Sequence, residues 1–262
     1  MSEEIVLMDV IDGVATITLN RPDTHNAFDE HMIAALSGKF DALHLEKNVH
    51  AVVLRGAGKS FSAGADLNWM KRAAEFTEQQ NKADALVLAA MLNKLYTLPV
   101  VTIACVQGAA MGGGMGLVSC CDVVLAEREA LFALSEVKLG LIPATIAPYV
   151  LRALGARQSR RYFQTGERFN GQHAFDIGFV HEVVTDAAEM ETRLATLLKG
   201  LAANGPHAMR EAKKLCQDME GQDITPALID DTASRIARTR AGLEAKEGLT
   251  AFLEKRKAGW VK

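Results

Sequence analysis

The segment RGAGKSFSAGADL, residues 55–67, follows the apolar run AVVL and separates two hypotheses about the fold. A strand followed by Gly-Lys-Ser suggests a nucleotide-binding P-loop, but that motif needs a glycine five positions before Gly58. Val53 occupies that position. The spacing therefore excludes a P-loop, and the second half of the segment, SFSAGADL, points to a different kind of site.

Predicted strands lie on both sides of this segment. In the first twenty residues, β-branched and apolar residues surround the pair Asp12-Gly13, which predicts two short strands joined by a tight hairpin. Short apolar runs at 51–54, 100–106 and 122–126 predict further buried strands.

Predicted helices separate these strands. Apolar residues recur at three- and four-residue spacing over 28–45 and 78–98, which predicts two amphipathic helices, and Pro99 ends the second. From about Thr185 the pattern is helical to the end of the chain. Strands and helices that alternate in this way predict an α/β fold of βαβ units with right-handed crossovers.

The composition argues against several classes of function. Charged residues make up 23% of the chain and the net charge is −3, so there is no electrostatic footprint for nucleic acid or an anionic membrane. The N-terminus has acidic residues where a signal peptide has basic ones, and no apolar run reaches about 18 residues. We expect a soluble, cytoplasmic protein without nucleic acid or membrane partners.

The cysteines do not have the spacing of metal ligands. There is no CxxC pair, and no His or Cys lies at ligand spacing from the adjacent Cys120 and Cys121. We therefore expect no metal site and reduced thiols throughout. The four thiols belong to Cys105, Cys120, Cys121 and Cys216.

Two glycine-containing segments follow predicted strands. In SFSAGADL, Gly64 lets the backbone turn sharply and the small residues Ala63 and Ala65 allow a ligand to approach, so the Ala65 amide is a candidate donor. In AMGGGMG, residues 110–116, the glycines uncover amides at the start of a helix, and the candidate donor is Gly113. Two such amides would form an oxyanion hole, whereas an ordinary glycine turn explains either segment alone.

Together, these motifs and their order resemble the crotonase superfamily of acyl-CoA enzymes. SFSAGADL is followed about fifty residues later by GAAMGGGMGLVSCCD and then by FALSEVKLGLIP, and the opening VATITLNRPDTHNAF and the ending AFLEKRKAGW also fit. The resemblance covers essentially the whole chain. It implies a crotonase-like spiral of repeated ββα or βαβ units over 1–195, a helical trimerisation region over 196–262, a homotrimer or hexamer, and no cofactor beyond the coenzyme A of the substrate.

The resemblance also implies catalytic residues. Ala65 and Gly113 match the family's two carbonyl-binding amides, and Glu136 matches its second acid/base residue; without the family, Glu136 beside Lys138 would be interpreted as a surface ion-pair partner. The typical hydratase has a glutamate where this chain has Gly116, so a two-carboxylate mechanism is not implied. A single-glutamate mechanism is left, which is either concerted syn hydration or a proton shuttle between two carbons.

The substrate implied is a branched 2-enoyl-CoA. SFSAGADLNWMKR, the missing first glutamate and SEVKLGLIPATIAPYV resemble bacterial 3-methylglutaconyl-CoA hydratases of leucine breakdown, some of which are named γ-carboxygeranoyl-CoA hydratases. The bulky residues after Glu136 are expected to reshape the acyl pocket. The alternatives are a Δ3,Δ2-enoyl-CoA isomerase and a non-catalytic member that binds acyl-CoA or RNA.

Further residues are implied in binding substrate or coenzyme A. They are His25, Asn26, Ala63, Asp66, Leu67, Gly116, Phe252 and Lys255, of which the last two belong to a helix that reaches a neighbouring subunit's coenzyme A in relatives. A solvated loop histidine explains His25 equally well. Asp66 is also predicted to cap the helix that follows it.

A glutaconyl group carries a distal carboxylate, which needs a positive or donor-rich partner in an apolar pocket. Lys71, Arg72 and Lys138 are the candidates, although each is also explained as a solvated surface charge. Trp69 and Met70 are expected to line either the core or the pocket.

Overall fold

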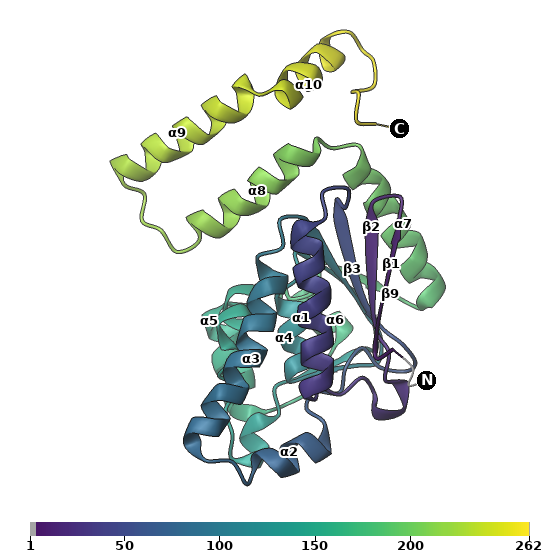
Figure 1. The fold of residues 1–262 in the computed structure, drawn as a ribbon, viewed down its shortest axis with the longest axis vertical. Coiled ribbons are helices and arrows are strands. Elements are labelled where there is room, and N and C mark those ends of the chain that lie inside the picture. Colours follow the sequence, from purple (N-terminus) through teal and green to yellow (C-terminus); the bar gives the residue numbers. More distant parts are fainter. Residues whose placement is uncertain (1–3, 262) are drawn as a thin grey trace. The chain divides into compact units, whose positions relative to one another are not determined.

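The computed structural model describes residues 4–261 and divides the chain into two compact units (Figure 1). The first unit extends to Leu98 and also contains Thr102–Leu194. The second contains Pro99–Val101 and the chain from Ala195 onward.

A six-stranded sheet forms the base of the first unit. The predicted hairpin is confirmed, because β1 and β2 pair in antiparallel register and Asp12 and Gly13 between them both have positive φ angles. The predicted buried strands are confirmed as β3, β4 and β6, and the strand order is β1-β2-β3-β4-β6-β9. The strands are β1 (Val6–Ile11), β2 (Val14–Leu19), β3 (Ala51–Gly56), β4 (Val101–Val106), β6 (Val123–Glu127) and β9 (Glu182–Val184).

The two predicted amphipathic helices are α1 (Glu30–Leu45) and α3 (Glu78–Tyr96), which contact each other and lie side by side in Figure 1. α1 begins two residues later than expected because Phe28 pairs with another segment and Asp29 caps the helix. α3 begins with a capping box between Thr77 and Gln80.

A second sheet of three short strands was not predicted. Its order is β5-β7-β8, from β5 (Ala109–Met111), β7 (Leu131–Ala133) and β8 (Phe169–Asn170). Along the chain, a strand of the large sheet is followed by one of the small sheet and then by a helix. This occurs in β4-β5-α4 and in β6-β7-η2-α5, where α4 is Gly113–Ser119, η2 is the 3₁₀ turn Glu136–Leu139 and α5 is Ala147–Thr165. The fold therefore repeats a ββα unit.

Helices complete the chain. A 3₁₀ turn, η1 (Pro22–Thr24), and the short α2 (Leu67–Ala73) lie in the first unit with α6 (Gly171–Asp176). The region after Thr185 is helical as predicted, with α7 (Ala187–Ala202), α8 (Pro206–Met219), α9 (Pro226–Ala241) and α10 (Leu243–Leu253). In the second unit, the Glu244 carboxylate accepts hydrogen bonds from the amides of His207 and Ala208 and so caps α8 from α10.

All four cysteines are free, and burial raises the pKa of the Cys105 thiol to about 11. No helix within residues 4–261 is long and apolar enough to cross a membrane. Nor do the side chains of this part of the chain contain a cluster of three or more His, Cys, Asp or Glu that could hold a metal ion.

Candidate active site

A cavity of about 130 Å³ in the first unit brings together the three residues predicted to be catalytic, Ala65, Gly113 and Glu136. The rest of its wall is formed by Phe28, Trp69, Leu88 and residues 142–146. The IPATI segment predicted to reshape the acyl pocket is therefore part of the wall, and so is Trp69.

Backbone pairing fixes the direction of the Ala65 amide. Phe28 pairs with Ala65 as in a parallel sheet: the Phe28 amide donates to the Gly64 carbonyl and the Asp66 amide donates to the Phe28 carbonyl, both at 2.7 Å. Successive residues of an extended chain point their amides in opposite directions, so residues two apart point the same way. Gly64 and Asp66 face Phe28, so the amide of Ala65 faces away from it, and this amide has no acceptor within residues 4–261.

The Gly113 amide is the second free donor. Gly113 is the first residue of α4, where the helix supplies no acceptor, and none is found elsewhere in the described chain. A Cβ on Gly113 would lie 3.0 Å from Cδ2 of Phe28. The Phe28 ring therefore packs against Gly113 while its backbone pairs with Ala65, which places one residue between the two amides.

Glu136 supplies the only carboxyl group that residues 4–261 contribute to the cavity wall. Its Oε2 is buried and has no hydrogen-bond partner among the described residues. Its Oε1 would lie 3.0 Å from a Cβ on Gly112, so the absence of a side chain there lets the carboxyl group approach the start of α4. Burial raises the pKa of Glu136 above its usual value, and its own backbone amide opposes this only in part.

Gly116, where the typical hydratase has a glutamate, lies inside α4 and is buried. A Cβ at this position would overlap the γ2 methyl of Ile146, which lies in the cavity wall. An apolar side chain thus fills the space that a side chain at position 116 would need. The missing carboxyl group is replaced by isoleucine and not by an open water site.

Several predicted coenzyme A ligands lie at the surface near Ala65. His25 and Ala63 are exposed, and the Ala63 amide donates to the His25 carbonyl at 2.9 Å. Leu67, the first residue of α2, is also exposed. Their contact with coenzyme A stays a prediction.

The side chain of Asn26 has a structural role. It is fully buried, and its side-chain amide donates to the carbonyl oxygens of Ala57 and Ser60 while accepting from the Arg21 amide. The predicted contact between this residue and coenzyme A stays a prediction. Asn26 holds the loop in place, and its left-handed φ of 54° is the kind that asparagine tolerates.

Phe252 and Lys255 lie at the end of α10 in the second unit, and neither contributes to the cavity wall. Phe252 is exposed. The predicted contact with a neighbouring subunit's coenzyme A stays a prediction.

The three candidate partners for a distal carboxylate do not line the cavity. Arg72 pairs with both carboxylate oxygens of Glu30 at 2.7 Å, and the Lys138 side chain lies against Gly166. Lys71 is exposed on α2. The structure therefore does not support the predicted cationic partner inside the pocket.

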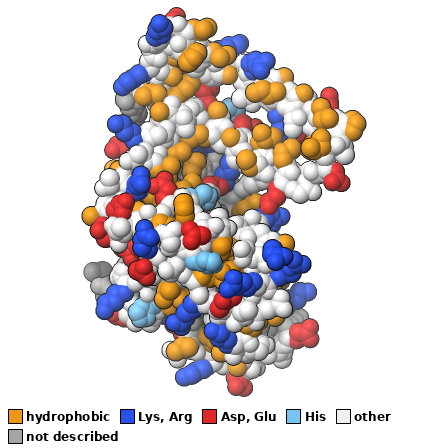
Figure 2. Space-filling model, turned by 180° about the vertical axis from the view of Figure 1, so that it is seen from behind, with side chains coloured by type: hydrophobic (Ala, Val, Ile, Leu, Met, Phe, Trp, Pro, Cys, Tyr) orange, Lys and Arg blue, Asp and Glu red, His pale blue; other side chains and the backbone are white. Residues whose placement is uncertain are grey.

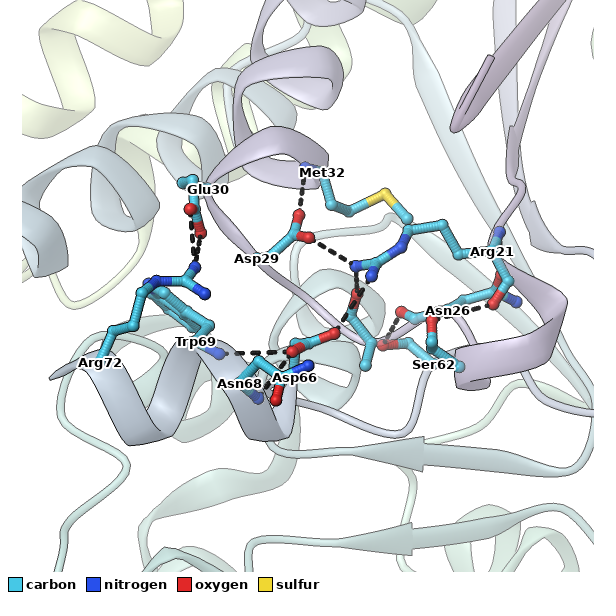
Figure 3. A network of polar contacts seen from close by, with 12 residues as sticks. Arg21, Asn26, Asp29, Glu30, Met32, Ser62, Asp66, Asn68, Trp69 and Arg72 are labelled. Carbon is cyan, nitrogen blue, oxygen red and sulfur yellow. Dashed lines mark hydrogen bonds and ion pairs between the residues drawn. The ribbon is translucent and has the colours of Figure 1, made fainter. Parts of the chain in front are cut away.

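The predicted cap at Asp66 is confirmed, since its Oδ1 accepts from the amides of Asn68 and Trp69 (Figure 3). Sequence reasoning missed Arg21, which pairs with both Asp66 and Asp29. Arg21 lies in the segment NRPDTHNAF, which resembles the corresponding segment of the crotonase superfamily but has no local pattern that indicates an ion pair. Its partner Asp66 lies 45 residues away, which no local pattern could indicate.

Comparisons with known proteins place the chain in one family. The family model described as "Enoyl-CoA hydratase/isomerase" matches residues 9–262. A putative enoyl-CoA hydratase of Thermus thermophilus is 33% identical over 243 residues, which cover 93% of this chain and 95% of that protein.

Solved structures match the fold closely. An enoyl-CoA hydratase from Shewanella pealeana has a TM-score of 0.95 and 41% identity, covering 99% of this chain and 97% of that one. Pseudomonas aeruginosa AtuE has a TM-score of 0.95 and 37% identity, covering 99% of this chain and all of that one. These matches confirm the predicted α/β crotonase fold.

The burial of Glu136 predicts that the stability difference between the wild type and Glu136→Gln depends on pH. Because the folded-state pKa is raised, the unfolded chain ionises first as pH rises, so the wild type loses free energy of unfolding above the ordinary pKa of 4.5. Glu136→Gln should therefore gain stability relative to the wild type as the pH rises above 4.5 in urea denaturation. The exposed Glu129→Gln is the control, and an equal pH response in both variants would contradict the assignment.

Glycine-to-alanine substitution inside a helix ordinarily raises the free energy of unfolding. The contact between position 116 and Ile146 predicts the opposite effect at Gly116. Gly116→Ala should lower the free energy of unfolding by about 1–3 kcal/mol through overpacking. Gly38→Ala in α1, where a Cβ meets nothing within 4 Å, should instead raise it by about 0.5–1 kcal/mol. In an Ile146→Ala background the penalty at position 116 should disappear; its persistence in denaturant titrations would rule out this contact as the cause.

Proposed function

The chain belongs to the enoyl-CoA hydratase/isomerase family, and we propose that its cavity adds water to a branched 2-enoyl-CoA thioester with Glu136 as the sole acid/base residue. One observation carries the proposal. The amides of Ala65 and Gly113, which have no acceptor among the described residues, lie in the same cavity wall as the unpartnered Oε2 of Glu136. The protein is an enzyme of the hydratase class, a carbon-oxygen lyase.

The amides of Ala65 and Gly113 donate to the thioester carbonyl oxygen, which gains negative charge as the adjacent double bond is attacked. Glu136 takes a proton from water while the water oxygen bonds to the β carbon. The electron pair of the double bond moves toward the carbonyl oxygen, and Glu136 then gives the same proton to the α carbon. Both new bonds form on one face of the alkene, so the addition is syn.

The raised pKa of Glu136 suits this double role. A carboxyl group whose pKa lies closer to neutrality accepts a proton from water more readily than an ordinary glutamate and can still return it. The apolar wall that raises the pKa also strengthens the hydrogen bonds to the carbonyl oxygen, because the local dielectric constant is low.

The specific substrate we propose is 3-methylglutaconyl-CoA, which would give 3-hydroxy-3-methylglutaryl-CoA. Its support is the sequence resemblance of the segments around Ala65 and Glu136. No Lys or Arg lines the cavity in the described chain, so the distal carboxylate would remain hydrated at the open side near Ile142 and Ala144, both of which are exposed. Thr145 offers the one hydroxyl group in this wall.

A second candidate activity is Δ3,Δ2-enoyl-CoA isomerisation. It is favoured by one observation, the replacement of the second carboxyl group by Ile146 against Gly116. A single carboxyl group can carry a proton from one carbon to another without water, and an apolar wall at this position does not hold a water molecule.

A product assay tests the proposal. Purified protein in ¹⁸O-labelled water should convert 3-methylglutaconyl-CoA to a product containing the label, detected by mass spectrometry, and should be compared with the uncharged 3-methylcrotonyl-CoA. Glu136→Gln should lower kcat by about 10²–10⁴-fold with coenzyme A thioester binding retained, while Glu129→Gln should not. Conversion of a 3-enoyl-CoA to its 2-enoyl isomer without label would favour the isomerase, and full activity of Glu136→Gln would reject both mechanisms.

We further propose that the chain assembles as a homotrimer or a pair of trimers through its C-terminal helices. Large apolar side chains on α9 and α10 are exposed in the single chain, and Figure 2 shows hydrophobic side chains over the C-terminal helices at the top of the view. They are Ile229, Ile236, Leu243, Leu249, Phe252 and Leu253.

Light scattering after gel filtration measures the assembly. The expected mass is three or six times 28.3 kDa. Ile229 and Ile236 lie on one face of α9, so changing both to Glu should lower the mass, whereas Arg238→Glu, about 180° around the helix from Ile229, should not. A monomeric wild type would reject the proposed assembly without affecting the assignment of the cavity.

A further inference from the structure

One arginine joins the two chain segments that present the Ala65 amide. Nη1 of Arg21 lies 2.8 Å from Oδ2 of Asp29 and donates to the Ala27 carbonyl at 2.9 Å, and Nη2 lies 3.1 Å from Oδ2 of Asp66. Figure 3 shows the guanidinium between the two carboxylates. The arginine itself precedes η1 and belongs to neither of the paired stretches.

The two carboxylates flank the backbone pairing that orients Ala65. Phe28 pairs with Ala65, and Asp29 and Asp66 are the next residues along the two segments. Each carboxylate also accepts hydrogen bonds from the first turn of a helix, Asp29 from α1 and Asp66 from α2. The guanidinium therefore ties the starts of both helices together beside the Ala65 amide.

Without Arg21, the two carboxylates would face each other with no cation between them. Their side chains are only 14% and 11% exposed, so repulsion between them is weakly screened. Desolvation raises the pKa of Asp66, but the amides of its helix and the Arg21 guanidinium outweigh this and hold the pKa below its usual value. Asp66 is thus ionised, and the repulsion acts on the residue next to Ala65.

We propose that Arg21 is a positioning residue that fixes the Ala65 amide in the direction of the thioester carbonyl. The inference rests on the proposed function, because Arg21 has no positioning role if the Ala65 amide binds no substrate. The Arg21 side chain bonds to Ala27, Asp29 and Asp66 within the described chain, whereas Gly113 and Glu136 come from α4 and η2. Loss of Arg21 should weaken one of the two carbonyl hydrogen bonds and leave the proton-transfer group in place.

The direct readout is the infrared stretching band of a bound thioester carbonyl. 3-Methylbutyryl-CoA is saturated and cannot add water, and the difference spectrum between its ¹²C- and ¹³C-carbonyl forms isolates its band from those of the protein amides. Two amide donors should shift the band of the wild-type complex to lower frequency than that of the free thioester. With one of two donors displaced, Arg21→Met should keep about half of that shift or less.

Kinetics provide a second readout with the substrate that the wild type turns over. Arg21→Met should lower kcat by about 10-fold or more, less than the 10²–10³-fold expected for complete removal of a donor. KM should change by less than about threefold, because the lost interaction strengthens in the transition state and adds little to ground-state binding. If Arg21 had a purely structural role, Arg21→Met would change the amount of folded protein but not the kcat or KM of the folded enzyme.

Arg55→Met is the matched control. The Arg55 side chain is 28% exposed against 20% for Arg21, and it also pairs with a carboxylate on another element, that of Glu191. It does not line the cavity. This variant should lose stability but retain the full band shift and kcat.

The outcomes separate the two hypotheses. A wild-type complex without any band shift rejects the oxyanion site and with it the proposed function. A wild-type shift that is fully retained in folded Arg21→Met overturns the role of Arg21 alone. If Arg21→Met does not fold, Arg21→Lys carries the test, since a compact ammonium group cannot reproduce the forked contact with both carboxylates. Its band should then lie between those of the wild type and the free thioester, and an unchanged band overturns the proposal.

Discussion

Close backbone packing between two strand ends determines the rest of this structure. A Cβ on Gly108 would overlap the Lys59 carbonyl, and a Cβ on Gly114 would lie 2.8 Å from the Ser62 carbonyl oxygen. Ser62 also exchanges backbone hydrogen bonds with the strand β5 at 2.8 and 2.9 Å. The chain can approach itself this closely only where side chains are missing. The two amides face one cavity because the segments that carry them are joined by their main chains.

The same packing explains how one carboxyl group comes to lie among apolar residues. Gly112 has φ 48° and no side chain, so Glu136 reaches the start of α4 without a steric barrier. An unpartnered buried carboxyl oxygen lowers the free energy of unfolding, and folded proteins retain such groups mainly where function requires them. Local destabilisation and catalytic usefulness have the same origin here, which is the removal of water from Glu136.

The sequence predicted the large elements, and its three candidate catalytic residues, Ala65, Gly113 and Glu136, all lie in one cavity wall. The hairpin around Asp12, the helices α1 and α3 and the cap at Asp66 follow from local rules that operate within a few residues. The small sheet was missed because strands of two or three residues cannot show an alternating pattern. The burial of Asn26, the double ion pair of Arg21 and the pairing of Arg72 with Glu30 depend on partners distant in sequence, which local patterns do not reveal.

The contact between Gly116 and Ile146 limits how this site can diversify. A carboxylate at position 116 cannot enter while the isoleucine methyl group fills its space, so a substitution there would be removed by selection for folding before any catalytic gain appeared. A smaller residue at position 146 must come first, when it offers nothing to catalysis. The two positions are therefore coupled: space for a side chain at position 116 opens only when the side chain at position 146 becomes smaller.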